Sequence, residues 1–534
     1  MHVDYRSLRF DYRRSPDQSS AQVTRHPVVV VGAGPVGLAT AIDLAQAGQR
    51  VLLLDDDRSL SNGSRAICFA KRTLEIFDRL GCGEAMMAKG VTWNRGRVFH
   101  REDPIYSFDL LPEGGHARPA FINLQQYYVE GFLLDRARAL PGIEIRWSNK
   151  VSAVEPSAEG VVLTVETPEG DYRILAAYLV AADGARSPIR RAMGLESKGR
   201  TFRDRFLIAD VRMMADFPAE RWFWFDPPFH PNQSVLLHSQ PDGVWRIDFQ
   251  LGWDADPVAE REPERVVPRV RALLGKDVEF ELEWVSVYTF SCLRMERFRH
   301  GRVIFAGDAA HGVSPFGARG ANSGVQDAEN IAWKLALVLR GEAPDSLLES
   351  YDQERVAAAD ENILNSTRST DFITPKNQAS SAFRNATLDL ARDCAFARRL
   401  VNSGRLSLPS IYRHSPLNTP DTEEFAGEMV PGAPALDAPL VRDGAPDWLL
   451  RRLGGGFTLL CFGRAPPAVP ETVPPLRAVT VMPNEDVEGI AARRYDARPG
   501  TTYLIRPDQH VCARWRCFEP GAVRAALDRA TGRA

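Results

Sequence analysis

The first strongly hydrophobic segment of the chain is a run of four valines that ends at a glycine-rich turn. Gly32, Gly34 and Gly37 follow at short intervals, and an alanine-rich stretch with helical spacing comes next. This order predicts a strand, a tight turn and a helix, in which backbone N–H groups can approach a pyrophosphate. The next apolar run, residues 51–54, ends at Asp55, where an adenosine ribose hydroxyl would find an acceptor. The simpler interpretation is a glycine turn that only packs the helix on the strand.

Helical and strand-like periods alternate in the segment that follows. Apolar side chains at helical spacing end at Gly81, a residue type that often follows the last turn of a helix. We expect a second helix at residues 125–140 and strands at residues 143–147, 161–166 and 172–182. These elements extend the nucleotide-binding unit that the glycine turn begins.

Short strand-like segments separated by proline and glycine dominate the middle of the chain and predict a separate, sheet-rich domain. Beyond them, an apolar strand at residues 303–306 and a long helix at residues 322–339 return to the earlier pattern. The nucleotide domain is therefore expected to be discontinuous. The strands expected in the middle domain are residues 206–213, 221–225, 235–238, 244–251 and 281–288.

A hairpin in this middle region alternates apolar and polar side chains after a turn at residues 241–243. If its polar face lines a cavity, His238 and Arg246, roughly opposite each other, could deprotonate a phenol or bind a carboxylate. Exposure of this face to solvent is the more common arrangement. Aromatic residues that could line the same site, but that more often pack in a core, are Trp222, Phe223, Trp224, Phe225 and Tyr288.

The last third of the chain begins with a mostly helical pattern over residues 371–400. Pro, Asn, Asp and Gly then cluster at residues 413–434, which is typical of a linker. We expect a further unit after it, with strands at residues 457–462, 476–481 and 503–505 and a helix at residues 522–530.

The composition is that of an ordinary globular protein. The 534 residues are 44% hydrophobic and 25% charged, which is enough for several domains with sizeable cores. A formal net charge of -3, with lysine and arginine scattered, gives no basic field for nucleic acid. Residues 1–25 lack an apolar signal segment, and no run predicts a membrane span. We therefore expect a cytoplasmic protein without nucleic-acid or membrane partners.

The seven cysteines are odd in number, widely spread and never arranged as C-x-x-C. This usage indicates a reducing compartment and argues against a zinc site. We expect no metal.

Two further stretches combine an apolar strand with a glycine and an acid. Residues 179–190 contain a tight Asp183-Gly184 turn before a basic helix start. Residues 302–335 contain a strand that ends at Gly307-Asp308, followed by a proline- and glycine-containing loop and a helix. With the first glycine turn, these stretches make three motifs in a fixed order.

In this order and spacing, the three motifs resemble those of the class A flavoprotein aromatic hydroxylases, single-component FAD-dependent monooxygenases such as the phenol and 3-hydroxyphenylpropionate hydroxylases. Arg65 in a Ser-Arg-Ala segment and Gln126, four residues before Glu130, fit the same family. The tail from about residue 432 is similar to the thioredoxin-like C-terminal domain of such enzymes, above all at residues 503–515, but it has no redox pair.

The resemblance implies an α/β fold: a Rossmann-like FAD-binding domain of glutathione-reductase type, an inserted β-sheet-rich substrate domain and a C-terminal thioredoxin-like domain. The expected boundaries are an N-terminal extension at residues 1–25, the FAD-binding domain at 26–195 and 290–370, the substrate domain at 196–289, a helical segment and linker at 371–430, and the thioredoxin-like domain at 431–534.

The resemblance also implies roles for individual residues. The first glycines would hold the FAD pyrophosphate, Asp55 the adenosine ribose, and Asp308 the ribityl side of the flavin. Asp183 and Arg190 would contact FAD or the reduced pyridine nucleotide. The expected FAD-binding residues are Gly32, Gly34, Gly37, Asp55, Arg65, Gln126, Asp183, Gly307, Asp308, Pro315, Gly320, Ala321 and Asn322.

The loop at residues 314–324 carries the mechanistic expectation. A helix that begins near Asn322 would direct its donors and its positive end at the flavin pyrimidine edge. The family loop often has the sequence G-G-Q-G-M-N, whereas this chain has G-A-R-G-A-N. Arg319 could therefore stabilise a flavin hydroperoxide or bind an acidic substrate. Alternatively, its guanidinium faces solvent or pairs with Asp327 or Glu329.

The expected function is hydroxylation of a phenolic or otherwise activated aromatic compound through a flavin hydroperoxide, with FAD as cofactor, O2 as co-substrate and NADH or NADPH as reductant. A homodimer is possible within this expectation. The catalytic candidates are His238, Arg246 and Arg319. The alternatives are a flavin-dependent halogenase, because residues 222–227 partly match a W-x-W-x-I-P pattern, a non-oxygenating flavin oxidoreductase, and a flavin-binding protein with vestigial redox activity.

Overall fold

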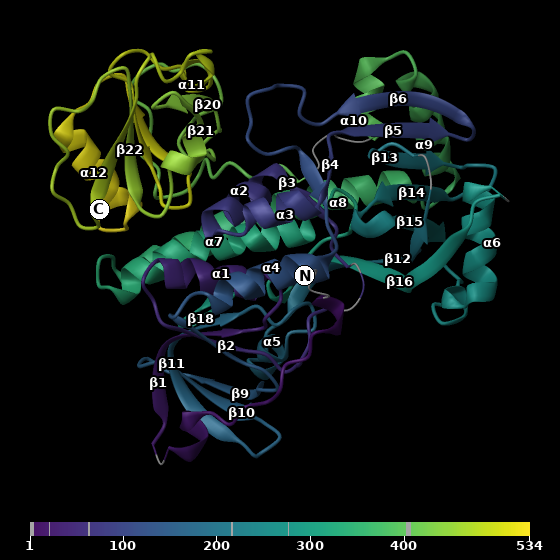
Figure 1. Cartoon of the computed structure of the whole chain (residues 1–534), viewed down its shortest axis with the longest axis horizontal. Coiled ribbons are helices and arrows are strands. Elements are labelled where there is room, and N and C mark those ends of the chain that lie inside the picture. The colour runs from purple at the N-terminus through teal and green to yellow at the C-terminus, as the bar shows by residue number, and fades with distance from the viewer. Residues whose placement is uncertain are drawn as a thin grey trace.

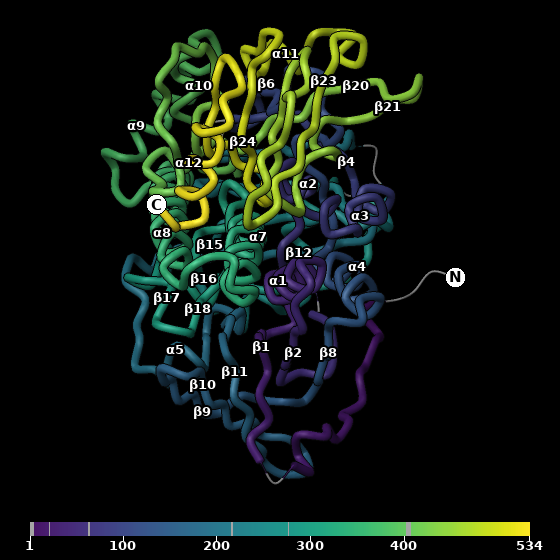
Figure 2. The backbone as a smooth tube through the Cα atoms, turned by 90° about the vertical axis from the view of Figure 1, so that its left-hand side faces the viewer, coloured from purple at the N-terminus to yellow at the C-terminus, as the bar shows by residue number. Residues whose placement is uncertain are grey.

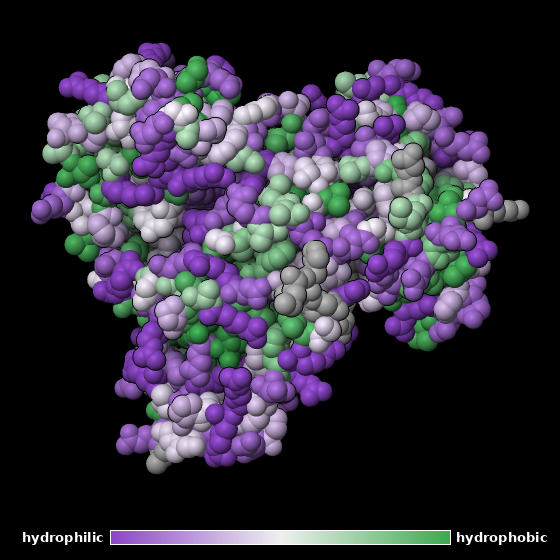
Figure 3. All heavy atoms as spheres, in the orientation of Figure 1, coloured by the Kyte–Doolittle hydropathy of each residue, from purple (hydrophilic) through white to green (hydrophobic). Residues whose placement is uncertain are grey.

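The computed structural model describes residues 5–20, 22–61, 63, 65–214, 217–275, 277–401 and 407–534. Figure 1 shows three units: a lower unit with the N-terminal strands, a sheet-rich unit at the upper right and the C-terminal unit at the upper left. The long helix α7 (Gly320–Leu339) crosses the middle of the molecule. In the space-filling view of Figure 3, the outline is indented between the two upper units.

The first sheet holds parallel strands that are buried on both faces. Its strands are β1 (Thr24–Val31), β2 (Val51–Leu54), β8 (Ile143–Arg146), β9 (Lys150–Pro156), β10 (Val161–Glu166), β11 (Tyr172–Ala181), β17 (Arg299–His300) and β18 (Val303–Phe305). The main order is β17-β18-β11-β1-β2-β8, with β1 parallel to β2 and β11. Figure 2 shows β1, β2, β8 and β11 side by side. Because helices and strands cover both faces of the sheet, β1 can contain a continuous run of valines without alternating apolar and polar residues.

Short helices and a small sheet surround this core. They are α1 (Pro35–Gln46), α2 (Lys71–Leu80), α3 (Gly83–Lys89), α4 (Gln126–Arg138) and α5 (Pro188–Ala192), with β3 (Cys68–Ala70), β4 (Val91–Trp93) and β7 (Phe121–Asn123). The small sheet has the order β3-β7-β4. Helix α2 ends at Gly81, whose φ of 88° lies in the left-handed region that favours glycine at this position. The predicted end of this helix is confirmed.

The second sheet is mostly antiparallel and has the order β19-β16-β12-β15-β14-β13-β5-β6. Its strands are β5 (Arg95–His100), β6 (Asp103–Asp109), β12 (Ser197–Met213), β13 (Arg221–Phe225), β14 (Ser234–Ser239), β15 (Val244–Leu251), β16 (Phe280–Met295) and β19 (His311–Gly312). Two of these strands, β5 and β6, come from a segment that the sequence placed in the FAD-binding domain, and β5 pairs with β13 in parallel. The expected boundary between residues 289 and 290 also falls inside β16. Strand alternation alone does not indicate which sheet a strand joins.

The two faces of the second sheet differ in chemistry. On one face, Trp222 and Leu237 pack in a hydrophobic cluster with Val266 of α6 (Pro263–Leu274). On the other face, which we call the inner face, the register places His238 directly opposite Arg246. The period of two along a strand separates these sets, because successive side chains point to opposite faces.

The C-terminal third begins with helices, continues through two small sheets and ends with helix α12 (Pro520–Ala530). The helices are α8 (Glu349–Ile373), α9 (Gln378–Ala391), α10 (Ala395–Val401), α11 (Ile490–Arg494) and α12 (Pro520–Ala530). The strands are β20 (Pro439–Arg442), β21 (Ala445–Trp448), β22 (Phe457–Phe462), β23 (Leu476–Val481), β24 (Thr502–Ile505) and β25 (Val511–Trp515). The four-stranded sheet has the order β23-β22-β24-β25. Only β22 and β23 are parallel in it.

A buried ionic cluster joins the C-terminal four-stranded sheet to helices α7 and α8. Arg506 donates to Glu354 of α8 at 2.6 and 3.0 Å, and Asp508 accepts from the Trp333 indole of α7 at 3.0 Å. All four side chains are buried. Within the described ranges, no helix is both long and apolar enough to cross a membrane, and no group of three or more His, Cys, Asp and Glu side chains is arranged to hold a metal ion.

Candidate functional site

The glycine turn after β1 is closed on one side and open on the other. A β-carbon at Gly32, whose φ is 103°, would lie 2.4 Å from the carbonyl oxygen of Ala182, and one at Gly37 would lie 1.8 Å from the oxygen of Gly32. A β-carbon at Gly34, the residue before α1, would meet no described atom within 4 Å. The turn therefore packs tightly against the Asp183 motif and leaves the N-terminus of α1 open, which fits a pyrophosphate.

Asp55 lies beside this turn at the end of β2. Its Oδ2 accepts from the backbone N–H of Ala33 at 2.5 Å and its Oδ1 from the N–H of Asp57 at 2.8 Å. Burial raises the pKa of Asp55 to about 6, which these two hydrogen bonds oppose. A carboxylate has about four acceptor positions, so it can still accept from a ribose hydroxyl.

The Asp183 motif meets both other motifs. The N–H of Ala182 donates to Val31 at 2.8 Å, next to the glycine turn. Arg190 donates to the carbonyl oxygen of Ala309 at 2.7 Å, next to Asp308. These hydrogen bonds bring three segments that are far apart in the sequence to one edge of the first sheet.

Within its own motif, Asp183 is mainly a helix-capping residue. Its Oδ2 accepts from Ser187 Oγ at 2.7 Å and from the N–H of Ile189 at 3.0 Å, at the start of α5. Its buried Oδ1 has no hydrogen-bond partner among the described residues. Burial raises the pKa of Asp183. The unpartnered oxygen is the part of this side chain that a cofactor could engage.

Asp308 is exposed, and the turn that carries it is held by the buried acid Asp327. The side chain is exposed, although the surrounding chain desolvates it and raises its pKa, an effect that His311 opposes. Below it, Asp327 of α7 accepts from the N–H of Gly307 at 2.9 Å and lies 2.6 Å from His311 Nε2. The Gly307-Asp308 turn is therefore fixed to α7 on its buried side, while the Asp308 side chain is exposed on the other side. A site for the flavin side chain requires such an exposed group.

The side-chain amides of Gln126 and Asn322 bind the backbone near the edge of the first sheet where the three motifs meet. Gln126 accepts from the N–H of Ala66 at 3.1 Å and donates to Glu130 at 2.7 Å. Asn322 accepts from the N–H of Ala70 at 2.8 Å and donates to the oxygen of Cys68 at 2.9 Å. Both amides thus position the segment around Arg65 and the start of α7.

The loop before α7 turns tightly at its proline. The N–H of Ala318 donates to the carbonyl oxygen of Pro315 at 3.1 Å, and Gly317 has a φ of 99°. Helix α7 then begins at Gly320, followed by Ala321, and no side chain caps it. The uncapped helix start agrees with the expected role of this loop in binding an anionic group.

Arg319 does not face solvent, so that alternative is wrong. Its side chain is 3% exposed and donates to Asn362 Oδ1 at 3.2 Å. The two acids that were its other suggested partners are engaged elsewhere: Glu329 binds Arg72, and Asp327 binds Arg355. Arg319 holds the loop against α8.

The polar face of the predicted hairpin is buried, so the expectation of solvent exposure is also wrong. His238 and Arg246 are 3% and 4% exposed, because the rest of the chain covers the inner face. Burial lowers the pKa of His238 well below its usual value, with Arg221 and Arg246 acting in the same direction. Arg246 donates to Asp210 at 3.2 Å and to the carbonyl oxygen of Arg65 at 3.0 Å. It therefore connects the second sheet to an expected FAD-binding residue.

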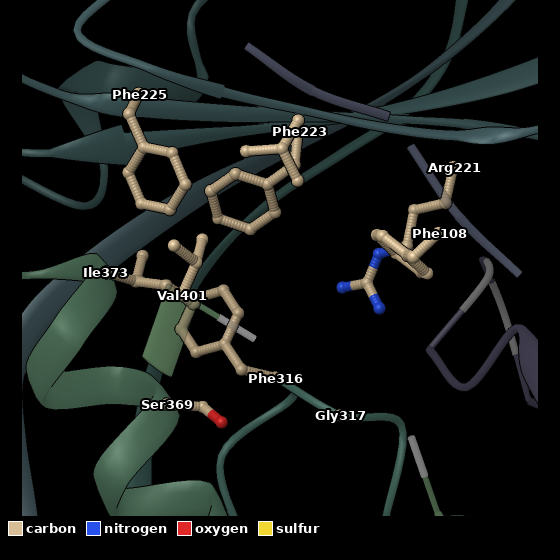
Figure 4. Close-up of a pocket in the computed structure, with 10 residues that line it drawn as sticks. Phe108, Arg221, Phe223, Phe225, Phe316, Gly317, Ser369, Ile373 and Val401 are labelled. Atoms are coloured by element: carbon tan, nitrogen blue, oxygen red, sulfur yellow. The ribbon is translucent and has the colours of Figure 1, made fainter. Parts of the chain in front are cut away.

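A narrow cavity, partly open to solvent, lies between the inner face and the loop before α7. Figure 4 shows Phe223 and Phe225 on one side and Phe316 on the other, with the Arg221 guanidinium extending into the space. None of His238, Arg246 and Arg319 lines it. The ten lining residues are Val98, Phe108, Arg221, Phe223, Phe225, Phe316, Gly317, Ser369, Ile373 and Val401.

Two of the aromatic residues predicted to line the site do line this cavity. Phe223 and Phe225 were expected as candidates, while Trp222 and Trp224 pack in the core cluster on the opposite face. Arg221 was missed, although the period of two that joins it to Phe223 and Phe225 was available in the sequence. Val98 and Phe108 belong to β5 and β6, which no sequence signal assigned to this sheet.

The comparisons with known proteins agree with this geometry. Residues 25–366 match the family described as FAD binding domain. The 12-dehydrotetracycline 5-monooxygenase/anhydrotetracycline 6-monooxygenase of Streptomyces rimosus is 30% identical over 508 residues, which cover 91% of this chain and 95% of that protein. The 3-(3-hydroxy-phenyl)propionate/3-hydroxycinnamic acid hydroxylase of Mycolicibacterium smegmatis is 28% identical over 452 residues, with 82% and 77% covered.

A solved structure shares the fold over almost the whole chain. The crystal structure of the flavin-dependent monooxygenase PieE in complex with FAD and substrate superposes with a TM-score of 0.82 at 22% identity, covering 96% of this chain and 100% of that one. The family match and the similarity to the Streptomyces enzyme extend beyond the motifs themselves. The chain therefore belongs to the FAD-binding domain family, among the flavin-dependent aromatic hydroxylases.

Proposed function

We propose that the protein hydroxylates an aromatic substrate with O2, using FAD that is reduced by NADH or NADPH. The observation that carries the proposal is the place of the cavity. One wall is formed by Phe316 and Gly317 of the loop expected beside the flavin, and the other by aromatic side chains of the second sheet. An aromatic ring bound there would lie next to the cofactor. When bound, FAD supplies the activation of O2.

The residues of the chain would hold and orient the reacting partners. The open turn at Gly34 and the N-terminus of α1 would bind the pyrophosphate, Asp55 the ribose and Asp308 the ribityl chain. The apolar rings of the cavity would exclude water and align the substrate. The positioning of Arg65 would depend on Arg246, which donates to its carbonyl oxygen at 3.0 Å.

The names of two relatives guide the choice of substrates to test. One relative is named for an anhydrotetracycline, which is polycyclic, and the other for a hydroxyphenylpropionate, which has one ring. We propose phenolic compounds of one to four rings as the range in which this chain finds its substrate.

The test is substrate-stimulated oxidation of NADH and NADPH by the purified flavoprotein under ¹⁸O2. We expect at least one phenol of the range to accelerate flavin reduction and to yield a product with one ¹⁸O atom. The Phe223→Ala variant should lose activity because it opens the cavity wall, whereas Phe99→Ala, on the opposite face of the same sheet, should keep it if folded. Reductant consumption without an oxygenated product from any phenol would contradict the proposal.

The halogenase alternative is not favoured. The two tryptophans that suggested it, Trp222 and Trp224, point away from the cavity and pack with Phe99 and Leu237. At the position of the isoleucine in that pattern stands Asp226, whose φ of 51° makes it a turn residue.

We also propose a thioredoxin-like C-terminal domain at residues 431–534 with a structural role. The parallel pair β22 and β23 followed by the antiparallel β24 and β25 supports it. Cys461 and Cys512 are buried thiols, and burial raises the pKa of Cys512 to about 12. Such a thiol is a poor nucleophile, which agrees with the lack of a redox pair.

A further inference from the structure

Arg221 is a buried cation without a partner. Its side chain is 7% exposed, and within the described residues its guanidinium forms no ion pair. Its Nε is buried without a hydrogen bond. Removing an arginine from water without a compensating partner destabilises the folded state, so buried arginines are normally paired. A partner that arrives with a ligand explains why this arginine is tolerated.

The direction of Arg221 shows where that partner would lie. It is the first residue of β13, and the period of two puts it on the same face as Phe223 and Phe225. In Figure 4 its guanidinium extends into the cavity, toward the space between Phe223 and the loop that carries Phe316 and Gly317. The cavity therefore combines apolar walls with one fixed cation at its end.

The polar groups near Arg221 do not pair with it directly. Asp248 acts on Arg221 through its charge, but it is not within ion-pair distance, and burial raises the pKa of Asp248 to about 6. The Cys68 thiol is neutral, because burial raises its pKa to about 11, and His238 is neutral as well. Arg246, on the same face of the sheet, is already paired with Asp210 at 3.2 Å. Among the described residues Arg221 therefore has no counter-ion in direct contact, and an anionic group of a ligand would supply one.

We propose that Arg221 binds the carboxylate of the substrate, so that the enzyme takes aromatic carboxylic acids. This proposal rests on the proposed function and names its substrate class. Two N–H groups of a guanidinium match the two oxygens of a carboxylate, while the aromatic ring occupies the space between Phe223 and Phe316. In this arrangement Arg221 determines the orientation of the substrate, with its carboxylate at the arginine end of the cavity.

The test is isothermal titration calorimetry of the FAD-loaded protein with three pairs of probes: 3-hydroxybenzoate, 3-(3-hydroxyphenyl)propionate and 3-hydroxy-2-naphthoate, each compared with its uncharged amide. In the wild type, at least one acid should bind about tenfold or more tighter than its amide, as a charge-assisted pair of hydrogen bonds requires. Arg221→Met should abolish this preference, and Arg221→Lys should keep part of it.

The matched control is Arg97→Met. Arg97 lies in β5 of the same sheet and is the register partner of Trp222, on the face that points away from the cavity. It forms an ion pair with Glu220 at the surface. Its loss removes the same charge but should leave the acid preference unchanged. A wild type that binds no acid better than its amide, or an Arg97→Met variant that loses the preference as Arg221→Met does, overturns the proposal.

Thermal unfolding of the ligand-free protein separates a binding role from a structural one. Because Arg221 is buried without a partner, Arg221→Met should raise the midpoint of unfolding, whereas loss of a structural arginine lowers it. A lowered midpoint therefore counts against the proposal. Both measurements are independent of turnover, so a protein that prefers acids but hydroxylates none of them would refute the proposed function and leave this assignment standing.

Discussion

The backbone N–H of Gly307 donates to the carboxylate of Asp327 at 2.9 Å, across the junction between the Gly307-Asp308 turn and α7. The same carboxylate lies 2.6 Å from His311 Nε2 and accepts from Arg355 Nε at 2.5 Å. Burial acts to raise the pKa of Asp327, but His311 and Arg355 outweigh it, so the pKa is lowered and the group is charged. One buried acid thus holds the turn that presents Asp308.

Asp327→Asn should destabilise the protein by about 3–5 kcal/mol, because it leaves Arg355 buried without its anion. It should also weaken FAD binding, since the turn loses its support. Chemical denaturation and FAD titration measure the two effects. Asp360→Asn, on the exposed surface of α8 where Asp360 pairs with Arg294, should cost less than about 1 kcal/mol. Equal losses of unfolding free energy and of FAD affinity in the two variants would contradict the role of Asp327 as the support of this turn.

Two glycines of the first turn should respond differently to alanine. Gly37→Ala should lower the midpoint of thermal unfolding strongly, because its β-carbon would lie 1.8 Å from the oxygen of Gly32. Gly34→Ala should fold with nearly unchanged stability, since the added methyl group points into open space. It should nevertheless weaken FAD binding about tenfold or more, because the methyl group occupies the approach of the pyrophosphate. Normal FAD affinity in Gly34→Ala would argue against this placement.

Local sequence patterns predicted several strands and helices of both large sheets well. The run that ends at Asp55 and the segment before Gly81 form the expected strand and helix, and β10, β13 and β15 have the predicted bounds. These elements depend on periodicity and on turn chemistry, which are local. The assignment of β5 and β6 to the second sheet depends on which edge was free for pairing, and that is a property of the whole fold.

The candidate site was predictable where a motif fixes the backbone. The Gly32 turn, Asp183 and Gly307-Asp308 meet at one edge, as the order of the motifs indicated. The burial and the partners of long polar side chains were not predictable. Arg246 and Arg319 are buried by segments that are distant in sequence, and the same burial left Arg221 without a partner. Periodicity assigns a side chain to a face and does not say what covers that face.

Asp55 should make the stability of the FAD-free protein fall as pH rises. Burial raises its pKa to about 6, so the folded state binds this proton more tightly than the unfolded state, in which the pKa is about 4. The penalty is absent below pH 4, grows between pH 4 and about 6, and reaches about 3 kcal/mol above that range. Asp55→Asn should flatten this part of the profile in denaturant titrations, while a profile identical to that of the wild type would contradict the assignment.

The interface of the C-terminal unit should depend on its buried ion pairs and not on its exposed ones. Arg506 binds Glu354 in a fully buried cluster, so Arg506→Met leaves that acid with Lys334 as its remaining cation and should cost about 3–5 kcal/mol. Arg451 also crosses the interface, to Glu84, but both side chains are exposed. Arg451→Met should therefore cost less than about 1 kcal/mol. Limited proteolysis between residues 413 and 434 should accelerate only in Arg506→Met, because loss of docking exposes the linker, and equal cleavage of both variants would exclude the buried pair as the docking element.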